Sequence, residues 1–229
     1  GAVTTVTLFW GAIGDRPGSV VQLLWNPHPW EYRGPVELEA SLDYRPIWAY
    51  RGRGAELPVA LRGPDGQLHP GQVVETEHTA MPDFPWRKRL VVPVSLPPCG
   101  WSVMELAWEE GVARPSRAAA ATAAVRLGEH AIGNGIFRVE ANPGAPGIDI
   151  RRDGSPVFAG AGLGVVTVDD AWGSWGGMAD EPASLDLSSV RHHWRVAASE
   201  VLEAGPERAL LAVRLTGGQS RLDLHLSLA

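Results

Sequence analysis

The sequence predicts an all-β protein organised as sandwiches, and three observations carry that prediction. Glycine and proline account for 27 and 19 of the 229 residues, and they interrupt the chain at short intervals. The runs between them are short and either apolar or alternating, as in strands. The sequence contains no segment of helix length with apolar residues at a 3.6-residue period. Many short strands separated by turn residues are typical of β-sandwiches.

The expected strands follow from these runs in chain order. They are 3–9, 20–25, 36–42, 57–61, 67–75, 88–96, 102–108, 135–140, 148–151, 164–169, 190–202, 208–215 and 221–228. Several of them are bounded by Asp-Gly or Gly-Gly, which tolerate the positive φ that tight hairpins need.

Local chemistry gives particular expectations for some of these strands. Val20–Trp25 is mostly apolar, so we expect it to be buried on both faces, and Pro27 ends it because proline lacks a backbone donor. Val36–Leu42 alternates apolar and polar residues, as a strand with one wet face should. The basic cluster Trp86–Arg89 is interpreted as the wet face of an edge strand. Asp153-Gly154 predicts a hairpin.

A domain boundary is expected between residues 109 and 125. The alanine run there has no apolar periodicity of its own, so a linker is favoured over a short helix. We therefore expect a small β-sandwich over residues 1–115, a linker over 116–125 and a second β domain over 126–229. By pattern the last expected strand is interrupted at Ala229, which indicates that the second domain is truncated.

Composition excludes several classes of partner. The net charge is −6 and almost every basic residue is arginine, with no basic stripe to neutralise phosphates, so nucleic acid is not expected as a partner. No apolar run reaches the length of a membrane span, so no membrane partner is expected. The single cysteine, Cys99, cannot form an internal disulfide and is compatible with a reducing compartment, which gives a cytoplasmic expectation.

Catalytic and metal-binding constellations are missing from the sequence. The seven histidines are scattered, without His-x-His or His-Glu-x-x-His spacing. His192 and His193 are adjacent on an expected strand, so they point to opposite faces and cannot share a metal. Asp169 and Asp170 are adjacent as well, so their side chains point to opposite faces. They therefore cannot act as the catalytic pair of a retaining glycosidase, whose two carboxyl groups lie about 5 Å apart. We expect no catalytic residue and no metal ligand in this chain.

One segment, Asp169–Met178, combines carboxylates, tryptophans and small residues between two expected strands. A carboxylate can accept hydrogen bonds from sugar hydroxyls while an indole ring covers the C–H face. Asp170, Trp172 and Trp175 are therefore the candidates for substrate contact. The alternative is that Trp172 and Trp175 are buried in a domain interface, as most of the ten tryptophans are expected to fill cores.

Six motifs occur in an order that resembles the C-terminal β domains of family 38 glycoside hydrolases, the α-mannosidases. The first is Asn-Pro-x-x-Trp, which precedes a Gly-x-Val-Glu strand; the others are Leu-Pro-Pro-x-Gly, Asn-x-Ile-Phe-Arg-Val, a strand with an Asp-Gly hairpin, Asp-x-Trp and Gly-Pro-x-Arg. They occupy residues 26–37, 96–100, 134–139, 147–154, 170–172 and 205–208.

The resemblance implies a fold and a role. It implies a small β-sandwich followed by the start of a large β-supersandwich of the galactose mutarotase-like type. The parent would be a retaining α-mannosidase whose zinc is held by Asp and His in an N-terminal barrel that this chain lacks, so no cofactor is expected here. This chain would be non-catalytic, pack on the barrel of the same polypeptide and line its α-mannoside cleft. A stand-alone carbohydrate-binding module and a purely structural interface sandwich stay open as alternatives.

Overall fold

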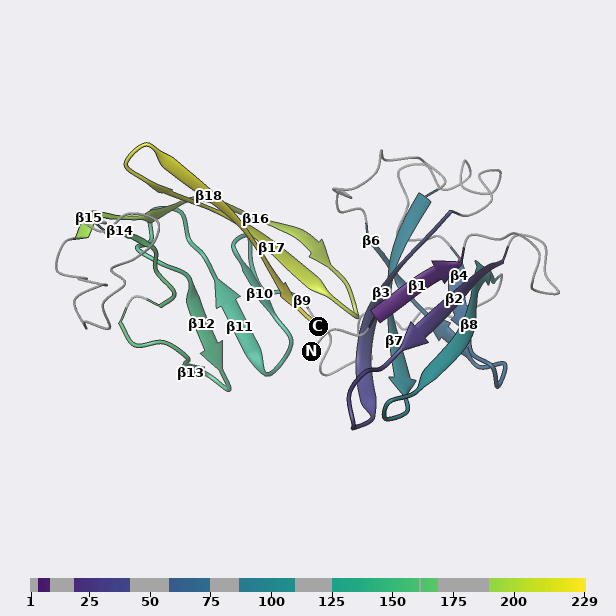
Figure 1. The fold of residues 1–229 in the computed structure, drawn as a ribbon. Coiled ribbons are helices and arrows are strands. Elements are labelled where there is room, and N and C mark those ends of the chain that lie inside the picture. Colours follow the sequence, from purple (N-terminus) through teal and green to yellow (C-terminus); the bar gives the residue numbers. More distant parts are fainter. Residues whose placement is uncertain are drawn as a thin grey trace, which may run out of the picture. The chain divides into compact units, whose positions relative to one another are not determined.

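The computed structural model describes residues 4–8, 19–41, 58–74, 87–109, 125–160, 162–168 and 190–229 (Figure 1). These residues form strands, turns and connecting segments with no helix among them, which confirms the prediction of an all-β sandwich fold. The chain divides into two compact units, residues 1–123 with 205–208 and 229, and residues 124–204 with 209–228. Of the expected linker 116–125, only Val125 is among the described residues.

The first unit is a sandwich of two antiparallel sheets. Its strands are β1 (Thr4–Leu8), β2 (Val20–Trp25), β3 (Tyr32–Ser41), β4 (Val59–Arg62), β5 (Leu68–Pro70), β6 (Gln72–Val74), β7 (Arg87–Leu96) and β8 (Trp101–Trp108). One sheet has the order β1-β2-β8-β4-β5 and the other β3-β7-β6. Buried leucines of both sheets form one core, with Leu24 and Leu106 from the first sheet and Leu38 and Leu90 from the second.

A corner at Gly71 divides what the sequence predicts as one strand, 67–75. Residues before the glycine form β5 in one sheet and residues after it form β6 in the other. A Cβ added at Gly71 would lie 2.8 Å from Val92 Cγ2 and 3.2 Å from Leu90 Cδ2. The glycine therefore lets the chain cross between the sheets in close contact with β7.

Two expectations for the first unit are wrong. β2 is not buried on both faces: Gln22 and Leu24 are buried, whereas Trp25 on the opposite face is exposed. β7, which carries the basic cluster, is the middle strand of its sheet and not an edge. Its Arg89 is tolerated there because the Nε atom lies 2.9 Å from Glu37 Oε1 on β3, which supplies the opposite charge.

The second unit is built from three antiparallel sheets. Its strands are β9 (Val125–Arg126), β10 (Ala131–Gly133), β11 (Phe137–Glu140), β12 (Asp149–Arg152), β13 (Ser155–Pro156), β14 (Val166–Val168), β15 (Val190–His193), β16 (Arg195–Ala204), β17 (Ala209–Gly217) and β18 (Ser220–Leu228). The sheet orders are β13-β12-β11-β10-β9, β16-β17-β18 and β14-β15. Ile132 and Val139 of the first of these sheets share one buried core with Leu211, Val213 and Leu215 of β17.

The hairpin predicted at Asp153-Gly154 is present. Both residues have positive φ, 47° at Asp153 and 80° at Gly154, and Arg152 pairs directly with Ser155 across the turn. A two-residue turn with positive φ at both positions is the type I′ geometry, whose twist matches that of the strands. The turn therefore fixes how β12 and β13 pair.

Ion pairs on the exposed face of β11 and β12 run along each strand. Arg138 Nη2 lies 2.6 Å from Glu140 Oε2, and Arg151 Nε lies 2.7 Å from Asp149 Oδ2. Across the strands the register places Arg138 opposite Arg151 and Glu140 opposite Asp149. The Arg138 hydrogen bond, followed by one from Asn142, holds the pKa of Glu140 below its usual value.

Candidate functional site

The predicted substrate-contact residues Asp170, Trp172 and Trp175 belong to segment 169–189, which lies outside the described residues. The structure does describe both flanks of that segment. Val168 at the end of β14 and Val190 at the start of β15 are direct partners in an antiparallel pair. The segment thus leaves and re-enters the fold at one place, and the role of its residues stays a prediction.

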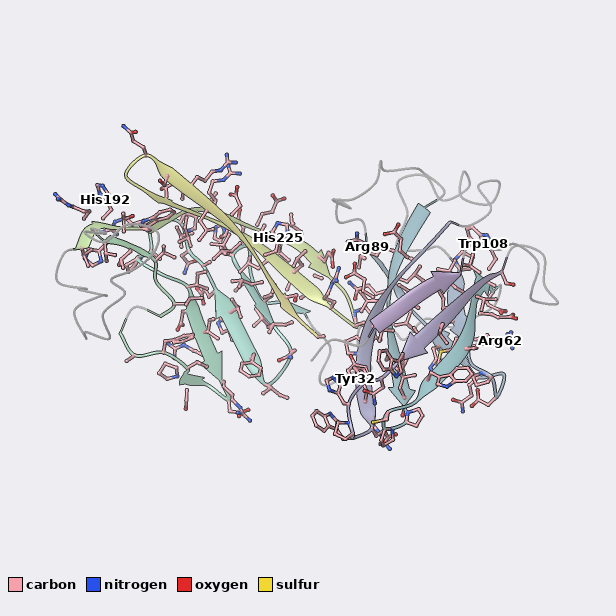
Figure 2. All side chains as sticks on the ribbon, in the orientation of Figure 1. Tyr32, Arg62, Arg89, Trp108, His192 and His225 are labelled. Carbon is pink, nitrogen blue, oxygen red and sulfur yellow. The ribbon has the colours of Figure 1, made fainter. Side chains whose placement is uncertain are left out.

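Within the described ranges, no three His, Cys, Asp or Glu side chains lie close enough together to bind a metal ion. His192 and His193 are both exposed on β15, opposite Thr167 and Val166 (Figure 2 labels His192). The described part of the chain contains no helix long and apolar enough to cross a bilayer.

Among the described residues of the first unit, several polar contacts meet at a corner centred on Asn26. Its side chain is fully buried; Nδ2 donates to the Trp30 carbonyl at 2.8 Å and to the Pro97 carbonyl at 2.9 Å. Its Oδ1 accepts from the His28 amide at 3.1 Å. Every described hydrogen-bonding group of this side chain is therefore used to hold the segment after β2 against the turn before β8.

Backbone contacts complete this Asn26 corner. The Asn26 amide donates to the Gly100 carbonyl and the Cys99 amide donates to the His28 carbonyl, each at 2.8 Å. Cys99 is exposed with φ of 46°, and a Cβ at Gly100 would lie 2.4 Å from Pro97 Cγ. The tight turn therefore requires glycine at position 100. Asn-Pro-x-x-Trp and Leu-Pro-Pro-x-Gly are thus two halves of one corner.

Two exposed indoles lie beside this corner. Trp25 and Trp101 are direct partners on β2 and β8, with exposed fractions of 48% and 63%. The adjacent pair, Asn26 and Gly100, carries the ladder hydrogen bond, so the tryptophans form the narrower non-hydrogen-bonded pair. Leu23 and Val103 form the next pair along the same face. We call Trp25, Trp101, Leu23 and Val103 the outer aromatic surface.

A further exposed indole, Trp30, occupies the segment that follows β2. It is 61% exposed, and its ring stacks on that of His28 with centroids 4.9 Å apart and planes 9° from parallel. Of the tryptophans that the structure describes, Trp25, Trp30 and Trp101 are exposed and only Trp108 and Trp194 pack against a core. The expectation that most tryptophans fill cores is wrong for this set.

The chemistry of the outer aromatic surface favours a protein partner over a sugar. A sugar site combines a stacking ring with several convergent hydrogen-bonding side chains. On this face the register places Leu23 and Val103 beside the tryptophans and Thr4 of β1 opposite Trp25, and the nearest charged row is that of Glu105, opposite Val21. Protein interfaces are rich in aromatic side chains and poor in charge at their centres. The surface is therefore suited to packing against another domain.

Comparison with known proteins gives likenesses in structure but none in sequence. No family profile matches the sequence, and no curated protein matches it. Among solved structures, the chain is similar to a protein in glycosyl hydrolase family 38 from Enterococcus faecalis, with 11% sequence identity and a TM-score of 0.49. The match covers 94% of this chain and 29% of that one, so this chain spans less than a third of its length.

Proposed function

We propose that this chain is the non-catalytic C-terminal β region of an α-mannosidase-like family 38 glycoside hydrolase. The parent enzyme would hydrolyse α-mannosides by a retaining mechanism in a zinc-dependent barrel of the same polypeptide. This chain would pack on that barrel, and the segment with Asp170, Trp172 and Trp175 would line one side of its cleft.

The observation that carries this proposal is the Asn26 corner. Two motifs on which the resemblance rests are joined by the hydrogen bond from Asn26 to Pro97, 71 positions away in the sequence. A polar residue of a third motif also has a defined structural role. Asn134 Oδ1 accepts hydrogen bonds from the amides of Ile136 and Phe137, at the start of β11. Motifs that matched by chance would not be expected to have their polar residues at such positions.

The outer aromatic surface gives the scaffolding role a physical basis. An uncharged sheet face with two exposed indoles leaves apolar surface in contact with water, which is unfavourable unless another surface covers it. A catalytic barrel of the same polypeptide is a suitable cover, because the two domains would be held at high effective concentration. We therefore assign the packing contact with the barrel to Trp25 and Trp101.

The proposal is tested by assaying two proteins with an aryl α-mannoside. A longer polypeptide that includes the region upstream of Gly1 should turn over the substrate, lose activity on chelation and regain it with zinc. The chain of residues 1–229 should be inactive and should retain no stoichiometric zinc. Turnover by residues 1–229 alone, or an upstream region without a barrel, would contradict the assignment.

A second test concerns the cleft-lining role. Trp172→Ala in the longer polypeptide should lower kcat/KM about ten-fold with little change in melting temperature, because one sugar contact contributes on the order of 1–2 kcal/mol. Trp30→Ala is the matched control, since Trp30 is exposed and stacks only on His28 among its described ring contacts. A lowered melting temperature with unchanged kinetics would show that Trp172 is a buried structural residue.

The second candidate function is a stand-alone carbohydrate-binding module. The exposed indoles of Trp25, Trp30 and Trp101 could stack on sugar rings, although the outer aromatic surface lacks the convergent polar side chains of a sugar site. It differs from the first in requiring no barrel. If the aromatic rings bind sugar, then Trp101→Ala should abolish glycan binding by the isolated chain. A purely structural sandwich, the remaining alternative, would bind no glycan by any face.

A further inference from the structure

A depression lies on the outer face of the sheet β16-β17-β18. The register places Ala198, Arg214 and Asp223 in one row across the three strands. The next row is formed by Glu200, Ala212 and His225. Side chains alternate along a strand, and the intervening β17 residues face the core, so both rows face away from it. Figure 2 labels His225 on this sheet.

The two alanines create the hollow. The small side chains of Ala198 and Ala212 form the floor of the depression. Their neighbours in the same rows are larger and polar, and these form its walls. The volume of the depression is about 390 Å³. Small-molecule sites occupy roughly 300–1,000 Å³, so this hollow has room for one small ligand.

The walls combine acceptors and donors: Glu200 and Asp223 supply carboxylates, and Arg214 and His225 supply nitrogen donors. Asp223 Oδ1 lies 2.7 Å from Arg214 Nε, and Asp223 Oδ2 lies 3.0 Å from Arg221 Nε. The hydrogen bond from Arg214 is the main reason that the pKa of Asp223 is lowered, so this carboxylate is a permanent acceptor near neutral pH. Glu200 on β16 contributes a second carboxylate. Of the two guanidinium groups that balance these carboxylates, only Arg214 lines the depression; Arg221 lies beside it, bound to Asp223.

This arrangement selects for ligand charge. A phosphate would meet two carboxylates, and a cation would meet the Arg214 guanidinium with that of Arg221 beside it, so neither is favoured. A neutral ligand with several hydroxyls can donate to the carboxylates and accept from Arg214 and His225 at once. Glu200 and His225 stand on the two outer strands, roughly 10 Å apart across the sheet, so one ligand can reach both.

We propose that this depression is a carbohydrate subsite for a single neutral pyranose unit, with Glu200, Asp223, Arg214 and His225 as its hydrogen-bonding groups. Ala198 and Ala212 admit the sugar ring to the floor. The proposal deepens the proposed function by naming a sugar site outside the segment with Asp170, and it rests on that function only for the choice of mannoside as the first probe.

The test uses the isolated chain with methyl α-D-mannoside and methyl β-D-galactoside, followed by saturation-transfer NMR and titration. A dissociation constant on the order of 1 mM is expected for a single sugar unit. Ala212→Leu, which fills the floor, should abolish binding, and Glu200→Gln should weaken it about ten-fold, as loss of a charged hydrogen bond does. Inorganic phosphate should not compete.

Matched controls separate the subsite from general effects. Ala204→Leu and Glu129→Gln make the same exchanges at exposed positions outside the depression and should leave binding unchanged. Circular dichroism of each variant checks that it is folded. Binding of galactoside but not mannoside would support the subsite while counting against the mannosidase parent. Failure of the unaltered chain to bind either glycoside, or binding that survives Ala212→Leu and is lost in Trp101→Ala, would overturn the proposal.

Discussion

Leu211→Ala should lower the free energy of unfolding of the second unit by about 2–5 kcal/mol, the range for truncating a buried leucine. Leu211 is fully buried on β17, the middle strand of its sheet, and packs in the core with Ile132 and Val139 of the opposing sheet. Its removal leaves a cavity between two paired sheets that cannot easily close. Urea unfolding followed by circular dichroism measures the change.

The matched control is Leu202→Ala, the same exchange on the adjacent strand β16. Leu202 is exposed, so its truncation should change stability by no more than about 0.5 kcal/mol. If both variants lost a similar amount of unfolding free energy, the assignment of Leu211 to the buried face of this sheet and Leu202 to the exposed face would be wrong.

Asn26→Ala should cost the first unit about 3 kcal/mol of unfolding free energy, although asparagine is not a core residue by type. The change leaves the Trp30 and Pro97 carbonyls without their donor and the His28 amide without its acceptor. A buried group that loses its partner costs about 1–3 kcal/mol. Thermal unfolding monitored by calorimetry reports the loss as a lowered transition for this unit.

Asn142→Ala provides the comparison for the asparagine exchange. Asn142 is exposed and donates one hydrogen bond to Glu140 Oε1, so its loss should cost less than about 1 kcal/mol. If Asn26→Ala were as mild as Asn142→Ala, the Asn26 corner would contribute little to the fold, and the structural support for the resemblance would fall with it.

The sequence predicts those parts of the fold that depend on local chemistry. Alternation and turn residues locate most strands, and Asp153-Gly154 specifies its hairpin because few residues tolerate positive φ at both positions. The division at Gly71 escapes prediction because the side chain that demands glycine, Val92, lies far away in the sequence. The exposure of Trp25 escapes it too, since burial depends on which elements cover a face.

The candidate sites show the same limit. Asp170, Trp172 and Trp175 could be singled out because they are neighbours in the sequence, and they stay a prediction. The depression on β16-β17-β18 has no local motif, since Glu200 and His225 are brought together by strand register alone. Nothing in the local sequence distinguishes the two alanines of its floor. They form a hollow only because the residues beside them on the sheet are larger.

The ion pairs of β11 and β12 have a consequence for how these strands find their alignment. Arg138 faces Arg151 and Glu140 faces Asp149, so across the strands like charges meet, which is unfavourable. A slip of two residues would place Arg138 opposite Asp149, an arrangement with better pairing of charges. The direct cross-strand pairs on the solvent side thus do not favour the observed alignment, and only the diagonal attraction between Glu140 and Arg151 offsets them. The apolar face accepts the slip as well, because it brings Ile148 opposite Val139. The observed alignment is instead favoured by Ile148, whose amide and carbonyl are both hydrogen-bonded to Leu163 at 2.9 Å and which would have to enter the ladder after the slip.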